Sequence, residues 1–130
     1  MERELQILTD AIPSLGELNS AIYSDEIGAV ASFLGVVRAT EGDSKIEALD
    51  YEVFESMAQR QFELIYDQIE KKWPQIASVK VIHRVGRVPV REASLWVEIQ
   101  SPHRAEAFAS MQFLIDTMKE TVPIWKATPA

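Results

Sequence analysis

The chain has 130 residues, with no cysteine and only two histidines. The absence of cysteine excludes disulfides and every metal site that needs thiolate ligands. A zinc site would have to be completed by carboxylates, because two histidines do not fill its coordination sphere. We therefore expect neither a bound metal nor a resident cofactor.

The sequence also lacks long apolar runs and an overall excess of basic residues. No stretch approaches the roughly 20 apolar residues of a membrane span, and the N-terminus is acidic and alternating rather than signal-like. We therefore expect a cytoplasmic protein. The net charge of −7 argues against nucleic acid and anionic membranes as partners. Residues 78–130 nevertheless hold 7 basic and 5 acidic side chains, against 6 and 15 in residues 1–77, which leaves room for a local anion site.

Hydrophobic periodicity predicts an α+β fold in one domain spanning residues 1–130. Residues 28–37 are apolar on both faces and indicate a buried strand, and residues 46–54 alternate and are expected to pair antiparallel with it. Ser101 and Pro102 suggest the cap and the first position of a helix. The predicted strands cover residues 3–10, 28–37, 46–54, 78–85 and 94–100, and the predicted helices cover residues 13–24, 56–72 and 102–121. This order favours a mostly antiparallel sheet with two main helices packed on it.

A lysine interrupts the apolar face of the last predicted helix. On a helical projection, one stripe contains Arg104, Phe108, Met111, Ile115 and Lys119. In one interpretation Lys119 snorkels, with its stem packed and its ammonium in water near the negative end of the helix dipole. In the other it is partly desolvated, which disfavours the charged form and suits a nucleophile or a general base. Lys126 follows the helix-breaking Pro123, so the two ammonium groups are expected to lie close together.

Cations also gather at the start of the same helix. His103 and Arg104 lie in its first turn, where free backbone N–H groups favour anions. Two cations there are unfavourable unless an anion or an acidic side chain offsets them, so an anion site and pairing with carboxylates are both open. Arg38 follows an apolar strand beside a glycine-containing loop and is a further candidate. The cations near the connection of the two later strands are expected to be mostly solvated, namely His83, Arg84, Arg87 and Arg91.

Four segments together resemble the large, catalytic subunit of molybdopterin synthase. They are GAVASFLGVVR, YEVFESMA, WPQIASVKVIHRVGRVPVREA and SPHRAEAFASMQFLIDTMKETVPIWK. The resemblance covers roughly residues 27–126. It rests on a combination of motifs: the strand ending in G-x-V-R, the IHRVG strand, the HR helix start and the K-x-x-x-P-x-W-K ending.

The resemblance implies an α/β-hammerhead-type fold and an enzyme that converts a cyclic pyranopterin monophosphate into molybdopterin by inserting two sulfurs as a dithiolene. A small ubiquitin-like subunit would deliver each sulfur as a C-terminal Gly-Gly thiocarboxylate. The assembly would be a heterotetramer, with a central homodimer in which strands such as residues 94–100 offer edges to pair. The implied catalytic residues are Lys119 and Lys126, and the implied substrate-binding residues are Arg38, His103, Arg104, Phe33 and Met111. Because the chain has no cysteine, sulfur would have to arrive on a partner.

Two other interpretations stay open. Family members usually continue past the W-K with a basic residue, a glutamate and a longer tail, whereas here Ala127 to Ala130 complete the sequence. The alternative to the sulfurtransferase is therefore a carrier-binding or assembly subunit of the same fold that lacks catalytic activity. The lysines alone would also suit a Schiff-base enzyme that acts on a phosphorylated carbonyl compound.

Overall fold

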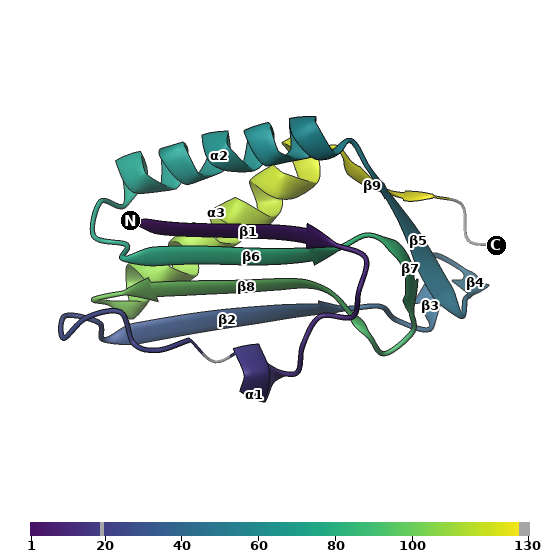
Figure 1. Cartoon of the computed structure of the whole chain (residues 1–130), viewed down its shortest axis with the longest axis horizontal. Coiled ribbons are helices and arrows are strands. Elements are labelled where there is room, and N and C mark those ends of the chain that lie inside the picture. The colour runs from purple at the N-terminus through teal and green to yellow at the C-terminus, as the bar shows by residue number, and fades with distance from the viewer. Residues whose placement is uncertain (19, 128–130) are drawn as a thin grey trace.

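The fold is built around a sheet of four strands. The computed structural model describes residues 1–18 and 20–127. The strands are β1 (Glu2–Leu8), β2 (Ala29–Val36), β6 (Ser78–Arg84) and β8 (Ala93–Ser101). Their order is β1-β6-β8-β2, with β6–β8 and β8–β2 antiparallel and β1 parallel to β6 (Figure 1).

A second sheet lies at the end of the first, where the chain passes from β6 directly into β7. It contains β7 (Gly86–Pro89), β5 (Ala48–Val53) and β9 (Ile124–Ala127), in that order and with antiparallel pairing (Figure 1). A short ribbon of β3 (Thr40–Glu41) and β4 (Ser44–Lys45) extends beyond it. Its turn contains Gly42 at φ 60°, a backbone conformation that favours glycine.

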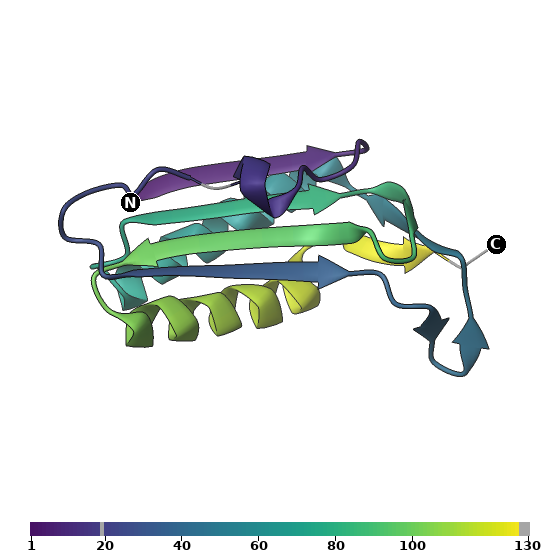
Figure 2. The same ribbon diagram turned by 90° about the horizontal axis from the view of Figure 1, so that it is seen from below.

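The two long helices, α2 (Glu55–Lys72) and α3 (Arg104–Thr121), pack on the same face of the main sheet (Figure 2). The short helix α1 (Leu15–Leu18) lies on the opposite face, where Lys80 Nζ donates to Ser20 Oγ at 3.0 Å. None of the helices in the described residues is long and apolar enough to cross a membrane.

The core lies between the main sheet and the two long helices. Alternation along β6 places Val79 and Val81 on the helix-facing side, and β8 adds Val97 from the next strand. Phe62 of α2 and Leu114 of α3 close the core, and all five side chains are fully buried. The α+β, hammerhead-type fold with two main helices on a mostly antiparallel sheet is therefore confirmed. The helix predicted at 56–72 is also confirmed within one residue.

The strand predicted to be buried is instead an edge strand. β2 pairs only with β8, and its Val30, Phe33 and Val36 are all exposed. The predicted pairing of residues 28–37 with residues 46–54 is also wrong, because β5 pairs with β7 and β9 in the second sheet. Both errors have one cause: an apolar run marks a strand, but it does not say which of several apolar strands takes the interior place.

The last helix begins later than its sequence predicts. Ser101 is the final residue of β8, its hydroxyl donates to the carbonyl of His103, and α3 starts at Arg104. His103 occupies the N-cap position without a side-chain cap. The predicted Ser-Pro cap is wrong because β8 keeps its ladder with β2 as far as Ser101, paired with Ala29.

Gly28 fixes the junction between β8 and α3. Its N–H donates to the Ser101 carbonyl at 3.1 Å, and a Cβ at this position would lie 2.3 Å from the carbonyl oxygen of Pro102. We expect Gly28→Ala to lower the free energy of unfolding by about 1–3 kcal/mol, because the backbone must move to make room. Gly16→Ala is the matched control, since nothing lies within 4 Å of its added Cβ. Urea unfolding compares them, and a Gly28→Ala protein as stable as the wild type would contradict the argument.

Candidate active site

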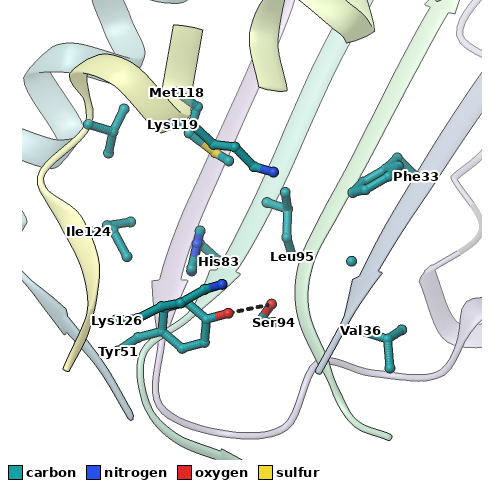
Figure 3. Close-up of a pocket in the computed structure, with 12 residues that line it drawn as sticks. Phe33, Val36, Tyr51, His83, Ser94, Leu95, Met118, Lys119, Ile124 and Lys126 are labelled. Carbon is teal, nitrogen blue, oxygen red and sulfur yellow. Dashed lines mark hydrogen bonds between the residues drawn. The ribbon is translucent and has the colours of Figure 1, made fainter. Parts of the chain in front are cut away.

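A cavity of about 340 Å³ lies where the end of α3 meets β9 and the ends of the sheet strands. Its floor comes from β6 and β8, and its sides come from β2, β5, α3 and β9 (Figure 3). The lining residues are Phe33, Gly35, Val36, Tyr51, His83, Ser94, Leu95, Met118, Lys119, Val122, Ile124 and Lys126. The cavity therefore combines an apolar wall with a few polar groups, which is typical of a small-molecule site.

Both predicted catalytic lysines line this cavity. Lys119 lies in the last turn of α3, and Lys126 lies in β9, opposite Tyr51 of β5. Between them α3 ends and the carbonyl of Pro123 accepts a hydrogen bond from the N–H of Phe54 at 3.0 Å, which directs the chain onto β5. Figure 3 shows both ammonium groups directed into the same space. The chain thus brings together two cations from two different elements.

Lys119 does not lie on a buried stripe as the helical projection predicts. The residues of α3 that are buried are Ala107, Ser110, Met111, Leu114 and Met118. Phe108 is 64 % exposed, and Lys119 is exposed beside the buried Met118. The buried face of α3 is shifted by about one residue from the predicted stripe, because α3 packs against both the sheet and α2. The ammonium of Lys119 therefore enters the cavity from an exposed position on α3 and not from its buried face.

Lys126 has an acidic neighbour. Its Nζ lies 3.0 Å from Glu41 Oε1, and the two side chains are 48 % and 37 % exposed. An exposed ion pair of this kind contributes only about 0–1 kcal/mol to stability. Glu41 therefore holds Lys126 at the rim of the cavity, and an incoming anion can displace it at little cost. No ion pair to Lys119 is found among residues 1–18 and 20–127.

Three polar side chains of the cavity were not predicted as site residues. The Tyr51 hydroxyl donates to Ser94 Oγ at 3.3 Å (Figure 3), and His83 lies on the floor with its ring edge-on to Tyr51. Burial lowers the pKa of His83 below its ordinary value near 6.5, although a hydrogen bond to the Arg84 carbonyl opposes the shift. The prediction of a solvated His83 is wrong. The signal was present, because alternation after Val79 and Val81 puts residue 83 on the buried face.

The buried His83 makes stability depend on pH. Below about pH 6.5 the unfolded chain binds a proton that the folded chain resists, so the free energy of unfolding should decrease as the pH decreases, by at most about 1.4 kcal/mol per pH unit. We expect His83→Asn to flatten this dependence between pH 5 and 6.5, and His103→Asn, which leaves His83 in place, to retain it. Urea unfolding over this range measures both, and an unchanged slope in His83→Asn would refute the assignment.

The predicted substrate-binding residues do not all meet in one chain. Phe33 lines the cavity, and Arg38 is exposed just beyond the cavity-lining Val36. His103 and Arg104 instead line a second hollow of about 460 Å³ beside Gly28, at the far end of α3. Fifteen residues of helix separate Arg104 from Lys119, which is about 22 Å.

Met111 also departs from its predicted place. It is 9 % exposed and packs in the core between α3 and the sheet, where it does not line the cavity. No ion pair involving Arg38, His103 or Arg104 occurs within the part of the chain that the structure describes. Of the two alternatives left open for His103 and Arg104, pairing with carboxylates is therefore not seen among the described residues, and both side chains are exposed.

Comparison with known proteins gives a consistent result. The MoaE protein family matches residues 8–121. The molybdopterin synthase catalytic subunit of Taeniopygia guttata is 39 % identical over 113 residues, which cover 87 % of this chain and 73 % of that protein. The crystal structure of molybdopterin synthase from Staphylococcus aureus superposes with a TM-score of 0.83 at 33 % identity, over 93 % of this chain and 87 % of that one.

A more distant structure has the same fold. It is a protein–protein complex of subunits 1 and 2 of molybdopterin-converting factor from Helicobacter pylori, with a TM-score of 0.78 at 22 % identity over 94 % of this chain and 82 % of that one. The family match covers most of the sequence, and it includes the helix that carries Lys119. The chain therefore belongs to the MoaE family, the family of molybdopterin synthase catalytic subunits.

Proposed function

We propose that this chain converts a cyclic pyranopterin monophosphate into molybdopterin, with each sulfur taken from the C-terminal thiocarboxylate of a small ubiquitin-like carrier. One observation carries the proposal: Lys119 and Lys126, which lie on different elements, direct their ammonium groups into one cavity of a chain from this family. A chain without cysteine cannot hold the sulfur as its own persulfide, so delivery by a partner fits the composition. A cytoplasmic location is part of the same proposal.

The two lysines suit the charge changes of this reaction. A protonated lysine attracts the anionic thiocarboxylate and stabilises the oxyanion that forms when its carbonyl carbon is attacked. Lys119 has the more direct role, because no acidic side chain among the described residues holds it. Lys126 must first exchange Glu41 for the incoming anion. The apolar wall around Phe33 and Leu95 excludes part of the water and strengthens both interactions.

The phosphate of the substrate would be held by residues from two copies of the chain. Arg38 lies near the lysine cavity, whereas His103 and Arg104 lie at the far end of α3, so one chain cannot bring all three onto one phosphate. A two-fold homodimer that places the start of one α3 near the end of the other would unite them. This extends the proposed assembly, a central homodimer within a heterotetramer with one carrier for each site.

The dimer contact predicted for residues 94–100 is wrong. β8 has neighbours on both sides, β6 and β2, so it offers no free edge. The free edges of the main sheet are β1 and β2, and β2 carries the exposed Val30, Phe33 and Val36. We therefore place the dimer contact at or near β2. Light scattering that finds only monomers at micromolar concentration would reject the dimer.

The direct test of the proposed function is a reconstitution. The purified chain is incubated with the pyranopterin precursor and a carrier that ends in a thiocarboxylate, and dithiolene product is measured. A carrier that ends in an ordinary carboxylate is the control and should give none. Product from the first carrier alone supports the sulfurtransferase. Tight carrier binding without product would support the non-catalytic alternative.

A further inference from the structure

His83 stands apart from the other polar groups of the cavity. It is the only buried ionisable side chain among the described residues that line it, at 6 % exposure. On the helix-facing side of β6, Val79 and Val81 belong to the hydrophobic core, and His83 is the last residue of this series and borders the cavity. A buried imidazole at this position needs an explanation, because burying a polar ring costs free energy that an apolar side chain would not.

The surroundings of the ring fix its tautomer. Nδ1 lies 2.8 Å from the carbonyl oxygen of Arg84, and since a carbonyl only accepts hydrogen bonds, Nδ1 carries the hydrogen. In the neutral ring Nε2 therefore has a free lone pair. Nε2 makes no hydrogen bond to any of the described residues. Among these residues, the buried side-chain atoms without a partner are Ser78 Oγ and Glu106 Oε2, so Nε2 of His83 is accessible to solvent. Nε2 therefore faces the cavity. The ring of Tyr51 packs edge-on against the imidazole, with 5.5 Å between the two ring centroids.

Burial keeps the His83 ring neutral, and two lysines reach the same cavity. Lys119 approaches from α3 and Lys126 from β9, while Tyr51 of β5 supplies the packed ring. Burial lowers the pKa of His83 below its ordinary value, and the hydrogen bond to the Arg84 carbonyl opposes this only in part. Near neutral pH the cavity thus contains one unprotonated imidazole together with the side chains of Lys119 and Lys126.

The proposed reaction has a step that needs such a base. Once the thiocarboxylate sulfur has bonded to the substrate, carrier and substrate remain joined through an acyl–sulfur bond. No cysteine of this chain can accept the acyl group. Hydrolysis separates the two: water attacks the acyl carbon, and a general base that removes its proton typically accelerates such an attack by about 10²–10⁴-fold.

We propose that His83 is the general base that releases the carrier, an inference that rests on the proposed function. Nε2 takes a proton from water as the water oxygen bonds to the acyl carbon. The carbon–sulfur bond then breaks, and the imidazolium returns the proton to the departing sulfur. The products are the carrier carboxylic acid and the substrate thiol, with no net oxidation or reduction. Lys119 stabilises the oxyanion between the two bond changes.

The decisive experiment follows the joined carrier–substrate species by intact-protein mass spectrometry in a single turnover. His83→Asn is the main variant, because the asparagine amide can still donate to the Arg84 carbonyl while it supplies no base. We expect this species to form at the wild-type rate in His83→Asn but to decay about 10²–10⁴-fold more slowly. Wild-type decay should slow as the pH falls through the pKa of His83, which burial places below 6.5, and the variant should lack this dependence.

A second variant separates chemistry from folding. His83→Ala leaves space for a free base, so added imidazole should accelerate decay in His83→Ala but not in the wild type. Decay at the wild-type rate in His83→Asn would overturn the proposal. A His83→Asn protein that binds carrier normally but never forms the joined species would overturn it too, because His83 would then act in the first step. If the wild type forms neither the joined species nor product, the proposed function itself is rejected.

Discussion

Lys119→Ala is expected to lose nearly all product formation, with a single-turnover rate about 10²–10⁴-fold below that of the wild type. The reason is geometric. Lys119 directs its ammonium into the cavity from the last turn of α3, and no ion pair among the described residues draws it away. The variant should fold normally, because the side chain is exposed and the neighbouring Met118 carries the packing.

Two further variants test whether the loss of activity is specific to Lys119. Lys71→Ala removes an exposed lysine from the last turn of α2, away from the cavity, and should retain the wild-type rate. Lys126→Ala should lose less activity than Lys119→Ala, because part of the Lys126 charge is already engaged by Glu41. If Lys119→Ala turns over as fast as Lys71→Ala, Lys119 is only a surface residue and the catalytic interpretation is wrong.

Arg104→Ala is expected to raise the KM for the pyranopterin substrate about tenfold or more, since a charge-assisted contact to phosphate contributes about 1.5–3 kcal/mol. A stronger test uses the two ends of α3 together. Each dimer site would take Lys119 from one copy and Arg104 from the other. In a hybrid of Lys119→Ala with Arg104→Ala, one site then carries both changes and the other carries none.

Isolated hybrids of these two variants should therefore recover about half of the wild-type activity, because one of their two sites is intact, although each parent dimer is impaired. Co-expression of the two chains with different affinity tags gives the hybrids, and an equal mixture of the separately purified parents is the control. Sites built within one chain would leave no intact site in any hybrid. Activity no greater than that of the parents would contradict the shared phosphate site.

The sequence correctly predicted the features whose signal lies in residues close together along the chain. The helix predicted at residues 56–72 matches α2 because Ala58, Phe62, Ile65 and Ile69 recur at helical spacing, and each is buried in the core. The strands predicted at residues 78–85 and 94–100 match β6 and β8, which pair antiparallel with each other. The nearness of Lys119 to Lys126 followed from Pro123, which ends α3 and leaves only a short return to β9.

The missed features depend on contacts between distant segments. Nothing in the sequence of β2 says that β8 is its neighbour on one side and that the other side is open. The face of α3 that is buried depends on α2 and the sheet together, so the projection placed Phe108 inside and Met118 outside the stripe. His83 was missed for a different reason. It was assigned to an exposed connection, although the alternation of β6 continues through it.

The most direct test of the central claim traces the sulfur itself. The carrier thiocarboxylate is prepared with a heavy sulfur isotope, and one batch of wild-type chain is given the labelled carrier and the pyranopterin precursor under single-turnover conditions. Mass spectrometry then counts the labelled sulfurs in the product. We predict a dithiolene in which both sulfurs are labelled, with Lys119→Ala giving essentially none. Product with unlabelled sulfur, or equal labelled product from Lys119→Ala, would contradict sulfur transfer at this cavity.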